Sequence, residues 1–343
     1  MSDTDTKIAA VLISAVASLI VALVSFFTTR SNQRDVEQLK SELEERRDER
    51  DARRDYEYEA RKRLYHQCGP LIFQLLEQAE GVLNRIGNLA RAASRGDLDP
   101  SRTWLSRDYY RLSTLHRFLA PIATLKEIQS RLTLVDLSLD PHVYLQYSVA
   151  RQLYYSFADD FDLANLSDPP LRYDPHALTA EADRRACPDV YWQQGIPIGI
   201  LDNAVDSLIV RQPEGARRIM TFAEFEAEHN CADSRLRCAF DRIGYLFDQF
   251  HPRKRPVLWR MLITQAHLYR ALLKTRAHDA LRFSLRELAS FPESERTRLD
   301  WRQAGEEIED RAVLEVPFDV AQKYLSTQLT PVLEKLSSAA GTA

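Results

Sequence analysis

The longest uncharged segment of the chain lies close to its start, from Ile8 to Thr29, and contains no proline or glycine. Lys7 precedes this hydrophobic segment and Arg30 follows it. A helix rises about 1.5 Å per residue, so about 22 residues span about 33 Å, enough to cross a hydrocarbon core of about 30 Å. The pattern predicts a transmembrane helix at 8–29, preceded by a short extracytoplasmic tail at 1–7.

A cleavable signal peptide is the main alternative for this segment. Such peptides have a basic start, an apolar core of about 7–15 residues and a cleavage site with small residues. Here Asp3 and Asp5 stand in the starting region, the apolar run is longer, and Phe26 and Phe27 are not followed by an Ala-x-Ala pattern. We therefore expect a retained single-pass anchor.

The basic residues beside the hydrophobic segment predict how it is oriented, because cytoplasmic flanks carry an excess of Lys and Arg. The N-terminal side offers Lys7, whereas the C-terminal side offers Arg30, Arg34, Lys40, Arg46 and Arg47. We expect the N-terminus outside and the bulk of the chain in the cytoplasm of an inner or plasma membrane. The cysteines, Cys68, Cys187, Cys231 and Cys238, show no disulfide-framework spacing, as expected in a reducing compartment.

Small residues recur every four positions within the hydrophobic segment, at Ala10, Ser14, Ser18 and Ala22. Small side chains allow transmembrane helices to approach closely, and serine hydroxyls can bond across the contact. We take self-association through this stripe as a hypothesis. The simpler interpretation is that Ala and Ser are common in single spans.

A charged segment at 30–66, here called the neck, follows the anchor without proline or glycine. Val36, Leu39 and Leu43 occupy a, d and a positions of a heptad, which predicts a short coiled coil. The next seam positions, Arg46, Arg50, Arg53 and Glu57, are charged. Oppositely charged residues four apart support a helix by about 0.2–0.5 kcal/mol per pair. The neck is therefore expected to continue as a solvated charged helix.

Apolar residues of the remaining chain recur at steps of three and four, as at Leu71, Leu75, Ala79, Val82 and Ile86. Only 10 of 343 residues are glycine and 28% are charged, which favours helices over turn-rich β structure. We predict an all-α protein whose multi-helix cytoplasmic body covers 67–337 and ends in a flexible tail at 338–343. A proline-rich stretch at 167–197 is the candidate boundary within the body.

Three helices of the body are expected on specific grounds. One resumes at Ile200 and runs to Val210. Thr221 and Glu224 form the pattern of a capping box, which predicts that a helix begins at Phe222. Pro256 stands where the first turn of a helix tolerates proline, before a strongly periodic segment.

Known catalytic motifs are missing from the sequence, including the Walker A loop, the Gly-x-Ser-x-Gly elbow, His-Glu-x-x-His and the dinucleotide fingerprint. His229, Cys231, Cys238 and His251 lack the short paired spacing of zinc sites. We therefore predict no metal and no cofactor, and we leave the catalytic residues unassigned.

A basic turn, Arg253-Lys254-Arg255, is the sharpest charge cluster and is flanked by prolines. It could contact an acidic partner or a phosphate group, although a solvated turn is the simpler interpretation. The formal net charge of −4 gives no support to nucleic-acid binding.

Together these features predict a membrane-tethered helical interaction or scaffold protein that recruits a cytosolic partner and self-associates through anchor and neck. Its expected partners are the lipid bilayer and a protein, either a different one or a second copy. Two alternatives stay open. One is a membrane effector or channel-forming subunit of a stress or anti-phage response, lined by Ser14, Ser18 and Ser25. The other is an enzyme with an unrecognised helical site, using His116, His142 or His267.

Overall fold

A computed structural model describes the chain at residues 3–98, 108–132, 137–158, 160–166, 196–213, 215–247, 250–252, 255–276, 284–303 and 312–341. The chain divides into two compact units, Met1–Arg61 and Lys62–Ala343. Helices dominate the described part of both units, which confirms the predicted all-α class.

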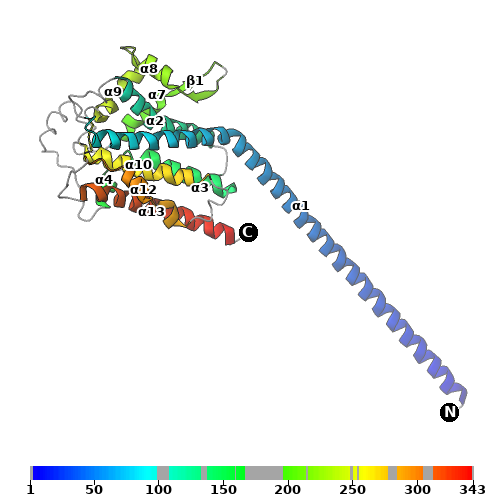
Figure 1. The fold of residues 1–343 in the computed structure, drawn as a ribbon. Coiled ribbons are helices and arrows are strands. Elements are labelled where there is room, and N and C mark those ends of the chain that lie inside the picture. Colours follow the sequence, from blue (N-terminus) through cyan, green and yellow to red (C-terminus); the bar gives the residue numbers. More distant parts are fainter. Residues whose placement is uncertain are drawn as a thin grey trace. The chain divides into compact units, whose positions relative to one another are not determined.

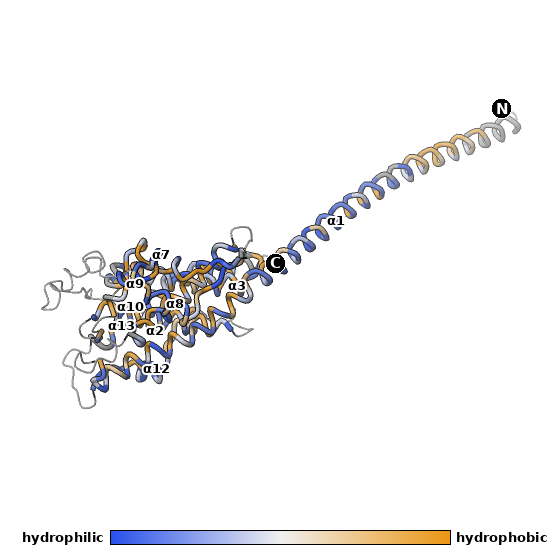
Figure 2. The backbone as a smooth tube through the Cα atoms, turned by 90° about the horizontal axis from the view of Figure 1, so that it is seen from above, coloured by the Kyte–Doolittle hydropathy of each residue, from blue (hydrophilic) through white to orange (hydrophobic). Residues whose placement is uncertain are grey.

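The first unit is built from the beginning of helix α1, whose full bounds are Asp3–Ser94. The helix already includes residues from Asp3 onward of the predicted N-terminal tail and continues through the hydrophobic segment into the neck. Figure 2 shows the change from hydrophobic to hydrophilic residues along this helix. Within the described residues, α1 is the one helix whose length and composition qualify it as a candidate membrane span.

The second unit is a bundle of helices with one small hairpin (Figure 1). After α1 its elements are α2 (Asp108–Arg131), η2 (Leu137–Leu139), α3 (Pro141–Tyr155), α4 (Asp160–Asn165), α7 (Ile198–Ser207), β1 (Ile209–Arg211), β2 (Arg217–Ile219), α8 (Phe222–His229), α9 (Arg235–Gly244), η3 (Tyr245–Phe247), α10 (Pro256–Lys274), α11 (Leu285–Ala289), α12 (Glu293–Arg298) and α13 (Ala312–Gly341).

Helix α10 is the centre of this unit, because it packs against both α3 and α13 and is buried over nearly its whole length. Its buried face carries Trp259, Leu262, Ile263 and Tyr269 among others. A helix that is apolar around most of its circumference is stable only inside a core. The periodic segment that predicted this helix therefore forms the core of the bundle, and the helix begins at Pro256 as predicted.

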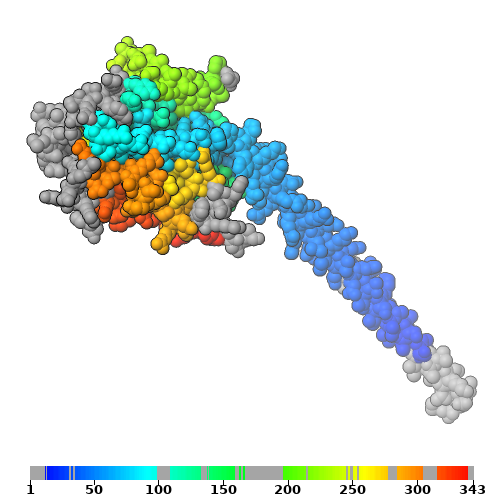
Figure 3. Space-filling view, in the orientation of Figure 1, coloured from blue at the N-terminus to red at the C-terminus, as the bar shows by residue number. Residues whose placement is uncertain are grey.

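The body part of α1 contributes a second apolar face, with Leu75, Ala79, Val82 and Ile86 fully or almost fully buried. A buried hydrogen bond also joins α1 to the neighbouring helix α2. Arg85 Nη2 of α1 donates to Ser113 Oγ of α2 at 2.8 Å. Figure 3 shows the C-terminal, cyan part of α1 beside the orange segment that contains α12.

The hairpin is a departure from the predicted helix that was expected to run from Ile200 to Val210. Helix α7 ends at Ser207, and β1 then pairs antiparallel with β2, with Ile209 opposite Ile219. Gly215 in the connection has φ 84°, a conformation that glycine adopts without steric cost. Strand β2 also packs against α2. This tertiary contact favours a strand over another half-turn of helix.

Two other boundaries can be compared with the sequence. The Thr221–Glu224 capping box is present and opens α8, as predicted. Helix α13 extends to Gly341, so it includes much of the segment expected to be a flexible tail. Most of the candidate boundary at 167–197 lies outside the described residues. Only its last two residues, 196–197, are described.

Candidate functional site

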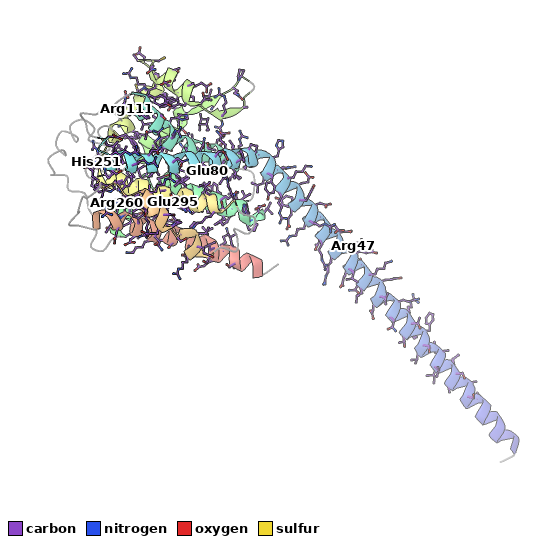
Figure 4. All side chains as sticks on the ribbon, viewed as in Figure 1. Arg47, Glu80, Arg111, His251, Arg260 and Glu295 are labelled. Atoms are coloured by element: carbon purple, nitrogen blue, oxygen red, sulfur yellow. The ribbon has the colours of Figure 1, made fainter. Side chains whose placement is uncertain are left out.

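A pocket of about 400 Å³ lies beside α10, between α12 and the start of α13. Figure 4 labels Arg260 of α10 and Glu295 of α12, on two of the helices that border it. The lining residues are Trp259, Glu293, Arg296, Thr297, Leu299, Asp300, Trp301, Arg302, Glu315 and Phe318. We call this hollow the α12 pocket.

Aromatic residues form the apolar part of the α12 pocket. The side chains of Trp259 and Trp301 are each only 2% exposed, and the ring of Trp301 lies edge-on to His251 at 5.6 Å. The guanidinium carbon of Arg296 lies 5.3 Å from the centre of the Phe318 ring, within cation–π range. The pocket therefore has rigid buried indoles beneath a charged rim.

The charges of the rim are only partly paired within the described residues. Arg302 Nε lies 3.0 Å from both carboxylate oxygens of Asp300. Burial alone would raise the pKa of Asp300, but the hydrogen bonds and charge of Arg302 outweigh burial and hold that pKa below its ordinary value. Among the residues described, neither Glu293 nor Glu315 forms an ion-pair contact, although the charge of Glu315 acts on Arg302. The pocket thus keeps carboxylates available for a cationic group.

Ion pairs hold α12 in place next to the pocket. Arg270 of α10 and Arg298 of α12 both contact Glu295, each at 3.3 Å. The Thr297 hydroxyl donates to the backbone carbonyl of Glu293 at 3.0 Å, so it is engaged within its own helix. The arrangement suits recognition of charge by fixed groups.

A second polar cluster joins α2, α3 and α7. Lys126 Nζ lies 2.6 Å from Asp202 Oδ1 and 2.9 Å from Asp206 Oδ1, and the Tyr154 hydroxyl donates to Asp202 at 2.9 Å. Burial raises the pKa of Tyr154, and the bond to Asp202 raises it further. The two aspartates lie one turn apart on α7, whereas Lys126 comes from α2, which is distant in the chain.

The residues predicted to mediate self-association all belong to α1 of the first unit. Ser14, Ser18 and Ala22 are exposed, whereas the side chain of Ala10 lies outside the described residues. Val36, Leu39 and Leu43 of the neck are 66%, 61% and 57% exposed. The seam is thus exposed to solvent over the described residues of the neck.

The basic turn can be placed only at its last residue, because Arg253 and Lys254 lie outside the described residues. Arg255 is half-buried and stands directly before α10. Its backbone N–H donates to the carbonyl of His251 at 2.9 Å. This bond links Arg255, the residue before α10, to His251.

The histidines of the enzyme alternative have separate partners. His116 Nε2 donates to the carbonyl of Met220 at 2.9 Å, and His142 contacts the amide of Gln146 at 3.2 Å. His267 Nδ1 lies 3.1 Å from the carbonyl of Ile263 and the ring stacks on Phe291 at 4.1 Å. These contacts give no shared carboxylate. Among the described residues there is also no group of three or more His, Cys, Asp or Glu side chains suited to a metal.

Comparisons of the chain with known protein families, curated proteins and solved structures found no match.

Proposed function

We propose that this protein is a membrane-tethered helical interaction protein, with the anchor at 8–29, the N-terminus outside and the body in the cytoplasm. The observation that carries the proposal is the exposure of large apolar side chains along one stretch of α1. Leu19, Val21 and Phe27 are 64%, 64% and 65% exposed. Removing apolar surface from water contributes about 25 cal/mol per Å², so a stretch of this kind needs a lipid or protein cover.

The polar groups of the same stretch support a lipid cover. Backbone groups of a membrane-spanning segment must be satisfied within the segment, and a helix does this. The hydroxyls of Thr28 and Thr29 donate to the carbonyls of Val24 and Ser25 at 2.6 and 2.7 Å. Their polar atoms are thus satisfied at the end of the segment without outside partners.

Fractionation of the full chain with different tags at its two ends tests the anchor. We expect both tags in the membrane fraction after alkaline carbonate washing. Loss of the N-terminal tag would identify a cleaved signal peptide, and release of the intact chain by carbonate would contradict the anchor. Accessibility of the two tags to protease in sealed vesicles of known orientation then tests the predicted topology.

The body is proposed to bind its partner at the α12 pocket. The pocket lining holds three acids and two arginines. Arg302 is paired with Asp300 and Arg296 lies over Phe318, so the carboxylates of Glu293 and Glu315 beside the buried indoles favour a basic segment of a cytosolic protein. A lysine or arginine side chain would place its aliphatic part on apolar surface and its charged end between acids. In this proposal the basic partner binds at the α12 pocket. The basic turn at 253–255, which was expected to contact an acidic partner, is not part of that site.

Titration of the detergent-solubilised full chain with a hexa-arginine peptide tests this site. The signal is the intrinsic tryptophan fluorescence, to which Trp259 and Trp301 contribute two of the four tryptophans. We expect a saturable change that is lost in the double variant Glu293→Lys/Glu315→Lys. Asp319→Lys is the matched control, because Asp319 lies on the same helix as Glu315 but does not line the pocket. An equal response in all three proteins would contradict the site.

A further inference from the structure

The neck carries a charge pattern that selects its own partner. If Val36, Leu39 and Leu43 are the a, d and a positions of a heptad, the g positions are Asp35, Glu42 and Glu49. The e positions are Lys40, Arg47 and Arg54. Every g position over these heptads is therefore acidic and every e position is basic. All six side chains are exposed.

Two copies of such a helix can pair in only one direction. In a parallel coiled coil the g residue of one helix faces the e residue of the next heptad in the other. This arrangement brings Asp35 to Lys40, Glu42 to Arg47 and Glu49 to Arg54, and every pair is attractive. An antiparallel pair would instead set acid against acid and base against base. Two copies anchored in one membrane are already parallel.

We infer that the necks of two copies of this chain form a parallel, in-register coiled coil over the seam from Val36 to Leu43, flanked by the ionic pairs Asp35–Lys40 and Glu42–Arg47. Beyond Leu43 the core positions Arg46, Arg50 and Arg53 are all basic, so the two helices separate there. The inference deepens the proposed function and relies on its anchor. The acidic side chains are available for this pairing. Within the described part of the neck, Asp35 and Glu49 form no ion pair, and Glu42 only accepts a bond from the Gln38 amide at 3.2 Å.

The basic side chains have intrahelical contacts that pairing can replace. Lys40 lies 4.0 Å from Glu44 and Arg47 lies 3.9 Å from Asp51, both at the outer limit of an ion pair, whereas Arg54 Nη2 lies 3.0 Å from Asp51 Oδ1. Figure 4 shows Arg47 projecting from the neck helix. Exposed pairs of this kind contribute little, so exchanging them for contacts across a seam is inexpensive.

A seam of three apolar residues is short for a coiled coil in solution, where three or four heptads are usual. Confinement to one membrane raises the effective concentration of the second copy, as a linker between two binding modules does. A shorter seam is then sufficient for pairing. The same register also continues into the anchor, where it meets Ala15, Ser18, Ala22, Ser25 and Thr29, all of them small. The pairing rests on the neck, and these anchor positions only have to allow two helices to approach.

A charge-exchange experiment on the full chain in native membranes tests the inference. One variant makes all g positions basic (Asp35→Lys/Glu42→Arg/Glu49→Arg), and the other makes all e positions acidic (Lys40→Glu/Arg47→Glu/Arg54→Glu). Two differently tagged copies are coexpressed and co-purified. We expect wild type to pair with itself, each variant to lose self-pairing, and the two variants to pair with each other. Unchanged self-pairing of either variant would overturn the inference.

Disulfide formation fixes the direction and register. In a background without the native cysteines, Leu39→Cys should give a cross-linked dimer in the membrane fraction, because d positions of a parallel pair bring the Cα atoms within disulfide range. Ser41→Cys, at an outward f position, is the control and should give none. Equal cross-linking at both sites would overturn the inference. Recovery of the chain in the soluble fraction would instead contradict the anchor, and co-purification would still test the neck.

Discussion

Gly87 of α1 leaves the space in which the guanidinium group of Arg298 lies. A Cβ atom at position 87 would stand 2.6 Å from Arg298 Nε and 2.8 Å from Nη2, too close for either to remain. In this position Arg298 Nη2 donates to the carbonyl of Leu83 at 3.1 Å and to Asn84 Oδ1 at 3.0 Å. The pair joins α12, which borders the candidate pocket, to the core helix α1.

Gly87→Ala is therefore expected to destabilise the body, although alanine is the better helix former by about 1 kcal/mol. Displacing Arg298 costs two hydrogen bonds from a charged group, reduced because the side chain is 31% exposed. We expect a net loss of about 1 kcal/mol in the free energy of unfolding, measured by urea denaturation in detergent.

The sign of this effect should reverse when Arg298 is absent. In an Arg298→Ala background, Gly87→Ala should stabilise the protein by up to about 1 kcal/mol, because only helix propensity remains. Gly81→Ala is the matched control on the same helix, since its nearest neighbour, Arg117 Nη1, lies 3.8 Å away. Destabilisation by Gly87→Ala in both backgrounds would contradict the proposed role of the glycine.

His267 should make the stability of the body decrease in mild acid. Burial lowers the pKa of His267 to about 3, despite the bond to the Ile263 carbonyl, so the folded state keeps this ring neutral. The contribution is complete above the ordinary pKa of about 6.5 and is lost as the pH falls from there toward 3. The loss is at most about 1.4 kcal/mol per pH unit.

His267→Phe should flatten this pH dependence while retaining the stack on Phe291 and the tilted contact with Phe318. The measurement is the free energy of unfolding of variant and wild type at pH 7.5, 6, 5 and 4, chosen around the ordinary histidine pKa. His66→Phe is the control, because His66 lies on the exposed face of α1. Parallel pH curves for His267→Phe and wild type would contradict the prediction.

The cluster of Lys126, Tyr154 and Asp202 should weaken in alkali. Burial alone would lower the pKa of Lys126, but its bonds to Asp202 and Asp206 outweigh burial and raise it. The pKa of Tyr154 is raised as well. Both groups are therefore more firmly protonated in the folded state, and the stability they contribute is complete below about pH 10 and lost above it.

Tyr154→Phe should consequently reduce the decline in stability between about pH 10 and 12. Tyr155→Phe serves as the control, because Tyr155 neighbours Tyr154 on α3 and does not bond to Asp202. The measurement is the unfolding temperature of both variants and of wild type, followed by circular dichroism across this pH range. The prediction is wrong if both tyrosine variants change the alkaline slope equally.

Glu127 should be one of the most sensitive polar positions of the body. Its side chain is 3% exposed and lies 2.9 Å from Arg131 Nε and 3.0 Å from Arg217 Nε, so it holds strand β2 to α2. Glu127→Gln leaves two arginines without their buried counter-charge and should cost about 3 kcal/mol.

The control for this variant is Glu80→Gln, which weakens the exposed contact between Glu80 and Arg276. An exposed ion pair contributes less than about 1 kcal/mol, so a much smaller effect is expected. Similar unfolding free energies for the two variants would show that Glu127 does not hold the hairpin.

The elements predicted correctly are those whose cause is local. The capping box from Thr221 to Glu224 lies within four residues, and Pro256 preorganises the first turn of its own helix. Apolar periodicity gave the buried faces of α1 and α10, because a helix repeats its faces every three or four residues. The heptad pattern of the neck is likewise read directly from the sequence, whereas its pairing with a second copy of the chain stays a proposal.

The candidate site depended on contacts that no local pattern encodes. Trp259 and Trp301 meet at the α12 pocket from segments far apart in the chain. Glu127 of α2 meets Arg217 of β2, a strand that the sequence pattern did not predict. Sequence by itself determined the helical class, the hydrophobic segment at 8–29 and the charged neck, since these follow from composition and period. The tertiary structure decided the pocket and the buried ion pairs, because only packing brings such side chains within hydrogen-bonding distance.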